Sequence, residues 1–177
     1  TGQSSEAEKY IMQMLDVGAG NRPAEISHSG NIVIDSLINH AYAAAQRDNV
    51  QFNVNVPVPA SLPFESGHLA IVLGNLLENA LEACQNIPDE KGFISLDISY
   101  AKDIFQLCIK NNYQAKRKKD IIGHYITTKG DNIYHGLGLS SINHAIANYH
   151  GQMDITDNDN IFQVIIVMYG SYSENTK

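Results

Sequence analysis

A single stretch, Leu69 to Asn86 (LAIVLGNLLENALEACQN), places the strongest constraint on what this chain can fold into. At the helical period its apolar residues gather on one side, while amides and carboxylates recur three or four residues apart on another. The stretch therefore predicts a core helix with one polar stripe. The apolar side comprises Leu69, Val72, Leu73, Leu76, Ala80, Ala83 and Cys84, and the stripe comprises Asn75, Glu78, Asn79, Glu82 and Asn86.

The two asparagines of the stripe, Asn75 and Asn79, have two interpretations. A solvated helix face usually carries Lys, Arg and Glu, whereas Asn is a mediocre helix former because its side chain competes for backbone hydrogen bonds. The pair can simply be surface. Alternatively, a neutral amide oxygen can ligate a magnesium ion whose other ligands are nucleotide phosphates and water.

Length, charge and cysteine content limit the class of protein. A chain of 177 residues is that of one domain, or one domain with a tail. With 12 Lys plus Arg against 19 Asp plus Glu, the formal charge is −7, which disfavours a nucleic-acid partner.

Cys84 and Cys108 lie in apolar patterns without metal-ligand spacing, so we expect reduced core residues and a cytoplasmic location. No apolar run reaches transmembrane length.

The first third of the chain predicts two helices and a strand. Ser5 and Glu8 resemble a capping box before a short amphipathic helix that reaches Asp16. After a loop, Asn31 caps a second helix that runs to about Asp48, with Ile34, Leu37, Ile38, Tyr42 and Ala45 on its apolar face. Val50 to Val56 alternates as a half-buried strand does, and it is followed by Pro57 and Pro59. Ser66 to His68 then lead into the asparagine-bearing helix.

Four more strands are predicted beyond that helix. Phe93 to Tyr100 and Ile104 to Lys110 form a hairpin, and Gln152 to Thr156 and Ile161 to Tyr169 flank a polar turn. Between the two pairs, Tyr113 to Tyr134 shows little periodicity and begins with a basic run, so we expect a long functional or mobile connection. The basic run can equally be a solvated face; it comprises Lys116, Arg117, Lys118 and Lys119.

A glycine-rich turn opens the last predicted helix, which we expect to end at Gly151. In residues 135–139 (HGLGL), Gly136 and Gly138 let the main chain approach an anion at the helix N-terminus, where free amides and the helix dipole favour negative charge. The signal is weak alone, because the third glycine and preceding strand of a dinucleotide fingerprint are missing, and an ordinary turn before a helix is the commoner explanation.

Together these motifs resemble the catalytic ATP-binding domain of sensor histidine kinases, in the GHKL superfamily shared with gyrase, Hsp90 and MutL. NLLENALEA (residues 75–83) matches the asparagine box, and HGLGL matches the second glycine box. The stretches SGNIVIDSLINHAYAAAQRDNVQF and ITTKGDNIYHGLGL look most like the quorum-sensing kinases of the AgrC and VirS type. The resemblance covers about residues 29–169.

The resemblance implies an α/β two-layer sandwich of the Bergerat type. It has a mixed, mainly antiparallel sheet of about five strands, helices on one face and a long ATP lid. We expect an N-terminal helix and linker over residues 1–30, the ATP-binding domain over 31–170 and a tail over 171–177. Carried over by position, Asn79 is the magnesium ligand, and the nucleotide contacts are Asn75, Asn79, Asn111, Thr128, Lys129, His135, Gly136, Leu137, Gly138 and Leu139.

Asn75 and Lys129 are the expected catalytic residues. Asn75 occupies the position where ATP-hydrolysing relatives place a general-base glutamate, and an amide cannot take a proton from water as a carboxylate does. This favours phosphoryl transfer over ATP hydrolysis. Lys129, seven residues before Gly136, is expected to fold over the phosphates of bound ATP, with a merely solvated lysine as the alternative.

The sequence departs from the family pattern at the first glycine box. Where the family has Asp-x-Gly-x-Gly, this chain has Asn111, Asn112 and Tyr113. The carbonyl oxygen of Asn111 can accept a hydrogen bond from the adenine amino group, but without charge assistance. We therefore expect weak nucleotide binding.

The expected partners follow from the missing phosphoacceptor. In the family that the chain resembles, the phosphoacceptor histidine is commonly followed by an acidic residue, and none of the seven histidines here is. The resemblance therefore implies an acceptor on an upstream domain of a longer, membrane-anchored, homodimeric protein. Its phosphate would pass to a response regulator of the LytTR type. His144 and His150 are read as helix-surface or helix-end residues.

Three functions stay open. The leading one is a histidine-kinase catalytic domain that uses ATP and Mg2+ on the cytoplasmic side of the membrane. The second keeps the fold as a weak nucleotide-sensing or docking module, and the third is a GHKL-type ATPase.

Overall fold

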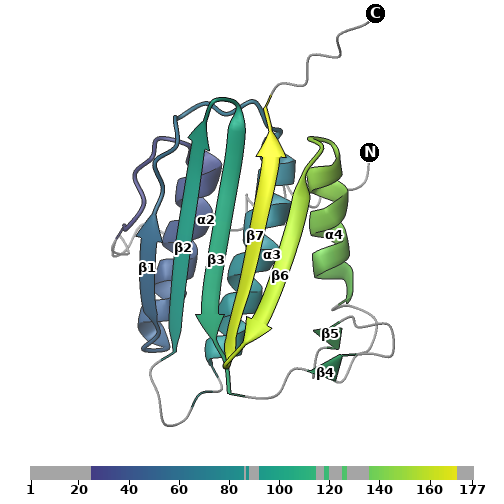
Figure 1. The fold of residues 1–177 in the computed structure, drawn as a ribbon. Helices are drawn as coiled ribbons and strands as arrows, with labels where there is room; N and C mark the ends of the chain where they lie inside the picture. The colour runs from purple at the N-terminus through teal and green to yellow at the C-terminus, as the bar shows by residue number, and fades with distance from the viewer. Residues whose placement is uncertain are drawn as a thin grey trace, which may run out of the picture.

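The computed structural model describes residues 25–85, 87, 92–114, 118–119, 125–126 and 136–170. In this part of the chain, five strands form one sheet in the order β1-β2-β3-β7-β6 (Figure 1). The pair β1 and β2 is parallel, and the other neighbours are antiparallel, which confirms the predicted mixed sheet. The strands are β1 (Gln51–Asn55), β2 (Phe93–Ala101), β3 (Ile104–Asn112), β6 (Gln152–Asn158) and β7 (Ile161–Tyr169).

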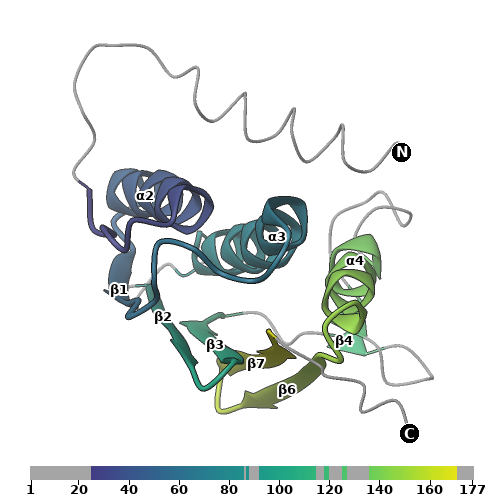
Figure 2. The same cartoon turned by 90° about the horizontal axis from the view of Figure 1, so that it is seen from above.

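Three helices cover one face of this sheet. They are α2 (Ile32–Arg47), α3 (Ser66–Cys84) and α4 (Gly136–Ala147). Figure 2 shows all three on the same side, with α3 between α2 and α4. The parallel pair β1 and β2 requires a crossover, and α3 supplies it. The predicted two-layer α/β sandwich is therefore confirmed. None of the described helices combines the length and apolarity that spanning a membrane requires.

The core lies between the sheet and the helices. Along β3 the residues Phe105, Leu107 and Ile109 are buried and alternate with more exposed ones. On α3 the predicted apolar side is buried, except that Ala83 is only half-buried. Cys84 is a free buried thiol, as predicted, but the prediction for Cys108 is wrong. Cys108 has the parity of the outer face of β3, so it is only half-buried.

The loop before α2 is held by two side chains of that helix. Asn31 caps α2 as predicted, because its Oδ1 accepts a hydrogen bond from the Ile34 amide. Asp35 accepts hydrogen bonds from the Ser27 and Ser29 hydroxyls and from the amides of Ser29 and Gly30, at 2.6 to 2.9 Å. Burial acts to raise the pKa of Asp35, but these bonds outweigh it and hold the pKa below its ordinary value.

Helices α3 and α4 have boundaries that differ from the predicted ones, and α3 ends at Cys84 and not at Asn86. Helix α3 begins at Ser66, three residues earlier than predicted, because Tyr149 anchors its first turn. The Tyr149 hydroxyl accepts the Glu65 amide at 2.9 Å and lies 2.8 Å from Nδ1 of His68. Helix α4 ends at Ala147 and not at Gly151, where an added Cβ would lie 2.7 Å from the Ile146 carbonyl oxygen.

Both hairpin turns are shorter than predicted. The β2–β3 turn has two residues, Lys102 and Asp103, with φ of 51° and 61°. The β6–β7 turn likewise has Asp159 and Asn160, with φ of 52° and 60°. A turn of two left-handed residues matches the twist of the flanking strands. The strands therefore stay paired up to the turn, although their polar ends had been assigned to the turns.

The long connection predicted between β3 and α4 contains a short piece of sheet. Strand β4 (Lys118–Lys119) pairs antiparallel with β5 (Tyr125–Ile126). No strand was predicted at these four positions, because two-residue strands are too short to show a periodic pattern. The predicted helix before Asp16, the tail over 171–177, and Lys116 and Arg117 of the basic run lie outside the described residues.

The carboxylate of Asp35 should make folding stability depend on pH. A group whose pKa is lowered in the folded state contributes stability above its unfolded-state pKa and loses it as the pH falls through the folded-state value. We expect Asp35→Ala to lower the free energy of unfolding by about 1 to 3 kcal/mol at pH 7. Urea unfolding should show that the difference in unfolding free energy between the wild type and Asp35→Ala becomes smaller below pH 4. A difference in unfolding free energy that stays constant down to pH 3 would contradict the role given to the Asp35 carboxylate. The matched control is Asp154→Ala, at an exposed position on β6.

Candidate functional site

Three described segments meet at one end of the sheet. Figure 1 shows the C-terminal end of α3, the last residues of β3 and the first turn of α4 at the same end, next to β4 and β5. Each of these segments carries one of the motifs found in the sequence. The fold therefore brings together residues that are more than sixty positions apart in the chain.

Two asparagines of α3 lie beside a glycine of α4. A Cβ added to Gly138 would lie 3.1 Å from Oδ1 of Asn75 and 4.0 Å from Nδ2 of Asn79. Both asparagines are half-buried, while Glu78, between them in sequence, is exposed. The polar stripe is thus divided: Asn75 and Asn79 lie on the side of α4, and Glu78 faces solvent.

The two amides differ in their hydrogen bonds. Asn75 donates from Nδ2 to the carbonyl oxygen of Ile71 one turn earlier, at 2.7 Å, which leaves Oδ1 directed toward Gly138. Within the described residues, the side chain of Asn79 has no hydrogen-bond partner. Its carboxamide is therefore available to a ligand, and an amide oxygen suits a hard cation such as magnesium. The described residues contain no group of three or more His, Cys, Asp or Glu that could hold a metal ion.

The N-terminus of α4 forms the opposite wall. The helix begins at Gly136, as the glycine pattern predicted, and its first turn contains no acidic residue. Its first amides lack carbonyl partners within the helix, so together with the helix dipole they favour an anion. Gly138 and Leu139 are half-buried, and Leu139 packs on the core. The absence of a side chain at Gly138 keeps this end of α4 close to Asn75.

Asn111 is buried at the end of β3, with a relative exposure of 2%. Its Nδ2 donates to the carbonyl oxygen of Asn112 at 3.0 Å. Its Oδ1 has no donor among the described residues. A buried acceptor without a donor costs free energy, so a ligand that supplies a donor fits here.

Asn112 has a structural role that sequence reasoning missed. Its Oδ1 accepts the amide of Phe93 at 2.7 Å and thereby ties the start of β2 to the end of β3. The thiol of Cys84 lies 3.6 Å from its carbonyl oxygen and 3.7 Å from its Oδ1. The sequence does contain a sign of this role, because two asparagines, Asn111 and Asn112, follow an apolar strand. Sequence reasoning assigned a function only to Asn111.

Tyr113 follows directly and closes this end of the sheet. Its hydroxyl donates a short hydrogen bond to Oδ1 of Asp157 on β6, and its amide donates to the carbonyl oxygen of Asn160. The region in which the family pattern has glycines is therefore bridged here by one side-chain and one backbone hydrogen bond.

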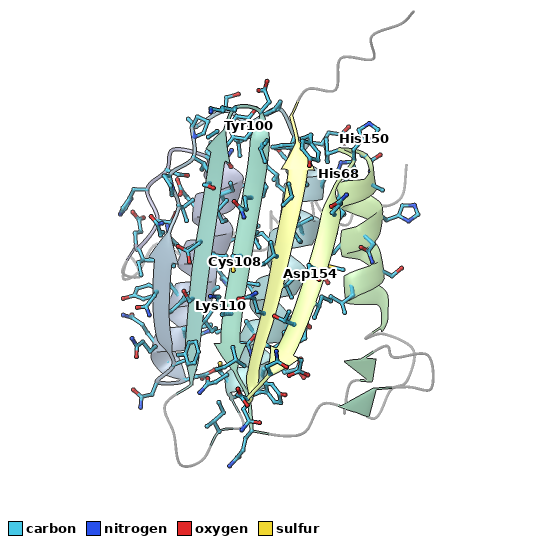
Figure 3. The ribbon with its side chains drawn as sticks, in the orientation of Figure 1. His68, Tyr100, Cys108, Lys110, His150 and Asp154 are labelled. Carbon is cyan, nitrogen blue, oxygen red and sulfur yellow. The ribbon has the colours of Figure 1, made fainter. Side chains whose placement is uncertain are left out.

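Several predicted site residues cannot be placed. Thr128, Lys129 and His135 lie outside the described residues, and only the backbone of Gly136 and Leu137 is described, as the start of α4. The predicted roles of all these residues stay predictions. Figure 3 shows His68 and His150 at the opposite end of the molecule from the first turn of α4. It also shows Cys108 and Lys110 of β3 and Asp154 of β6 on the strands, whose outer face the described helices leave uncovered.

One protein-family model matches the sequence of this chain. The model described as "GHKL domain" matches residues 65–169. These residues include α3, β3 and α4, and therefore every described residue of the candidate site. Among curated proteins, no sequence matches this chain.

Solved structures of several histidine kinases share the fold. The catalytic domain of histidine kinase ThkA has 20% identity and a TM-score of 0.63, covering 81% of this chain and 96% of that one. The mycobacterial sensor histidine kinase MprB has 17% identity and a TM-score of 0.55, covering 78% and 93%. Histidine kinase AdeS of Acinetobacter baumannii has 13% identity and a TM-score of 0.56, covering 95% and 77%. At these identities the likeness concerns the fold.

The contact between Gly138 and Asn75 can be measured by a double-mutant cycle. Gly→Ala in a helix normally stabilises by about 0.5 to 1 kcal/mol. In the wild-type background the new methyl group would press on Asn75 Oδ1, which the bond to Ile71 holds in place, so we expect Gly138→Ala to be neutral or destabilising.

In an Asn75→Ala background the same change should stabilise by the full helix-propensity amount. Thermal or urea unfolding of the four proteins should give a coupling energy of about 1 kcal/mol. Additive effects of the two substitutions would show that the two side-chain positions do not touch.

Proposed function

Because this chain belongs to the GHKL domain family, we propose that it is the ATP-binding catalytic domain of a sensor histidine kinase. In this proposal it transfers the γ-phosphate of Mg-ATP to a histidine on an upstream domain. One observation carries the proposal: Asn75 and Asn79 lie beside Gly138 in the first turn of α4, at the end of the sheet where the buried Asn111 has an acceptor without a donor. The three similar structures named above are those of histidine kinases, which supports the choice within the family.

In this proposal, three groups of the site contact three different parts of Mg-ATP. The free amides of α4 hold the phosphates, because they carry partial positive charge and point out of the helix end. Asn79 supplies an amide oxygen to magnesium, whose remaining ligands are phosphate oxygens and water. Asn111 accepts a hydrogen bond from the amino group of adenine. ATP provides the group that is transferred.

Asn75 favours transfer to a protein side chain over transfer to water. Its Nδ2 is bonded to the Ile71 carbonyl, and an amide cannot accept a proton from water as a carboxylate does. Its place beside Gly138 also suits it to hold α3 and α4 at the correct separation. Lys129, Thr128 and His135 complete the proposed site from the lid side.

The remaining parts of the proposal follow from the resemblance of the sequence. Residues 31–170 are the ATP-binding domain, with the linker to the phosphoacceptor domain before it. In this proposal the chain is of the AgrC and VirS type and acts on the cytoplasmic side of the membrane. It dimerises through its phosphoacceptor domain and passes phosphate to a LytTR-type response regulator.

Substitution of Asn79 tests the magnesium ligand. Calorimetric titration of the 177-residue chain with ATP should give measurable binding in Mg2+, and Asn79→Ala should weaken it at least tenfold, because one metal ligand is lost. In EDTA the two proteins should bind equally weakly. Asn53→Ala, an exposed asparagine on β1, is the matched control and should leave binding unchanged. No binding by the wild-type chain at millimolar Mg-ATP would overturn the proposal.

A second candidate is a nucleotide-sensing module of the same fold. The bond between Tyr113 and Asp157 favours it, because it bridges a region where the family pattern has glycines. Mixing the chain with Mg-ATP and its natural upstream domain, supplied separately, should label a histidine of that domain. ATP binding without any such labelling would favour the sensing module. Steady-state phosphate release should stay near the uncatalysed background, and appreciable release would favour an ATPase.

A further inference from the structure

Tyr149 follows α4 by two residues and connects the end of this helix to the start of α3. Its hydroxyl oxygen accepts a hydrogen bond from the Glu65 amide at 2.9 Å and lies 2.8 Å from Nδ1 of His68. Burial raises the pKa of Tyr149, so the hydroxyl keeps its proton and can donate it to Nδ1. Figure 3 shows His68 at the end of the molecule opposite to the first turn of α4. The contact therefore lies far from the candidate site.

The ring and the backbone of Tyr149 are also held in place. Its carbonyl oxygen accepts the amide of Tyr169, the last residue of β7, at 3.1 Å. Its ring packs edge to face on the buried ring of Phe64, with the two centroids 4.9 Å apart. Tyr149 therefore joins the C-terminal end of α4 to the sheet as well as to α3.

Packing holds the second half of α4 more firmly than its first turn. Ile142, Ala145 and Ile146 are buried, whereas Gly138 is half-buried. Figure 2 shows α4 at one end of the row of described helices, next to α3. The three buried residues lie about midway between Gly138 and Tyr149. Since a helix of 12 residues is a rigid element about 18 Å long, a tilt about these residues moves its two ends in opposite directions.

The geometry at the first turn of α4 is sensitive to such a tilt. A Cβ added to Gly138 would lie 3.1 Å from Oδ1 of Asn75, so a shift of a few tenths of an ångström decides whether the two positions press on each other. Hydrogen bonds from backbone amides to an anion have a similar tolerance, because their N–O distances fall between about 2.7 and 3.2 Å. The tilt of α4 therefore determines the geometry of the candidate site.

We propose that Tyr149 is a positioning residue of the candidate site: by holding the far end of α4 against α3, it sets the separation between the first turn of α4 and Asn75. Tyr149 acts through the helix, from the end opposite to the site. The inference rests on the proposed function where it concerns Mg-ATP. Where it concerns Asn75 and Gly138, it rests on the packing of α3 and α4 alone.

The main test removes the hydroxyl and keeps the ring. In Tyr149→Phe the contact with Phe64 remains, while the Glu65 amide loses its acceptor. In this background the double-mutant cycle of Gly138→Ala and Asn75→Ala is measured by urea unfolding, as in the wild type. We expect the coupling energy to fall to about half of its wild-type value or less, because a less restrained helix can tilt away from the new methyl group.

A merely structural role of Tyr149 gives a different result. It would lower the stability of all four proteins of the cycle equally and leave the coupling energy unchanged, which would overturn the inference. Additive effects of Gly138→Ala and Asn75→Ala in the wild type would also overturn it, because the close approach that Tyr149 maintains would then not exist.

Calorimetric titration of the 177-residue chain measures the effect on the site itself. Tyr149→Phe should weaken binding of Mg-ATP about threefold, since the first turn of α4 is displaced from its position. Unchanged affinity together with a reduced coupling energy would overturn the role of Tyr149 in positioning the site and leave the proposed function standing. No binding by the wild-type chain at millimolar Mg-ATP would overturn the proposed function, while the unfolding cycle would still decide whether Tyr149 positions α4.

A second variant and a matched control complete the test. His68→Phe removes the other partner of the Tyr149 hydroxyl and keeps an aromatic ring beside it, so it should also reduce the coupling energy. It decides the question if Tyr149→Phe fails to fold in thermal unfolding. The control is Tyr42→Phe, which removes a 2.8 Å hydrogen bond from Gln46 within α2 and should leave coupling and affinity at their wild-type values. A loss of coupling in this control would overturn the assignment to Tyr149.

Discussion

The structure depends on α3 packing in two directions at once. Its apolar side, from Leu69 to Cys84, is buried against the sheet and α2 and supplies much of the core. Its amide side faces α4, which can come close only because Gly138 has no side chain there. Burial of apolar surface holds the helix in place and in turn fixes the positions of Asn75 and Asn79. Stability and site geometry are therefore set by the same element.

Neutral hydrogen-bonding groups dominate the described part of the site. Asn75, Asn79 and Asn111 are amides, and the first turn of α4 offers backbone amides without an acidic residue beside them. Such a site holds its polar groups in position through backbone contacts, as Ile71 does for Asn75 and the Asn112 carbonyl does for Asn111. The cost of burying these groups stays moderate, because an amide is far cheaper to desolvate than an ion.

The sequence pattern was enough for the main helices and strands, and the family resemblance supplied the two-layer arrangement. The sequence also singled out Asn75, Asn79 and Gly138, which lie together in the structure. Periodicity located α2, α3 and the five main strands, because each has one clearly apolar face. Periodicity was insufficient where tertiary contacts determine the end of an element. The first turn of α3 depends on Tyr149, more than eighty residues away, and the end of α4 depends on the tight turn at Gly151. The role of Asn112 also stayed hidden, because its bond to Phe93 joins two strand ends that only the register brings together.

The order of strands also affects how the chain can fold. Strand β7 is last in sequence but lies inside the sheet, where it pairs with β3 and β6. Before β7 is synthesised, β3 is an edge with unpaired amides and carbonyls along nine residues, from Ile104 to Asn112. Such an edge can pair with other chains, and closing it requires contacts across about 50 to 65 residues. The nascent chain is therefore most exposed to aggregation after β3 has formed and before its final strand is synthesised.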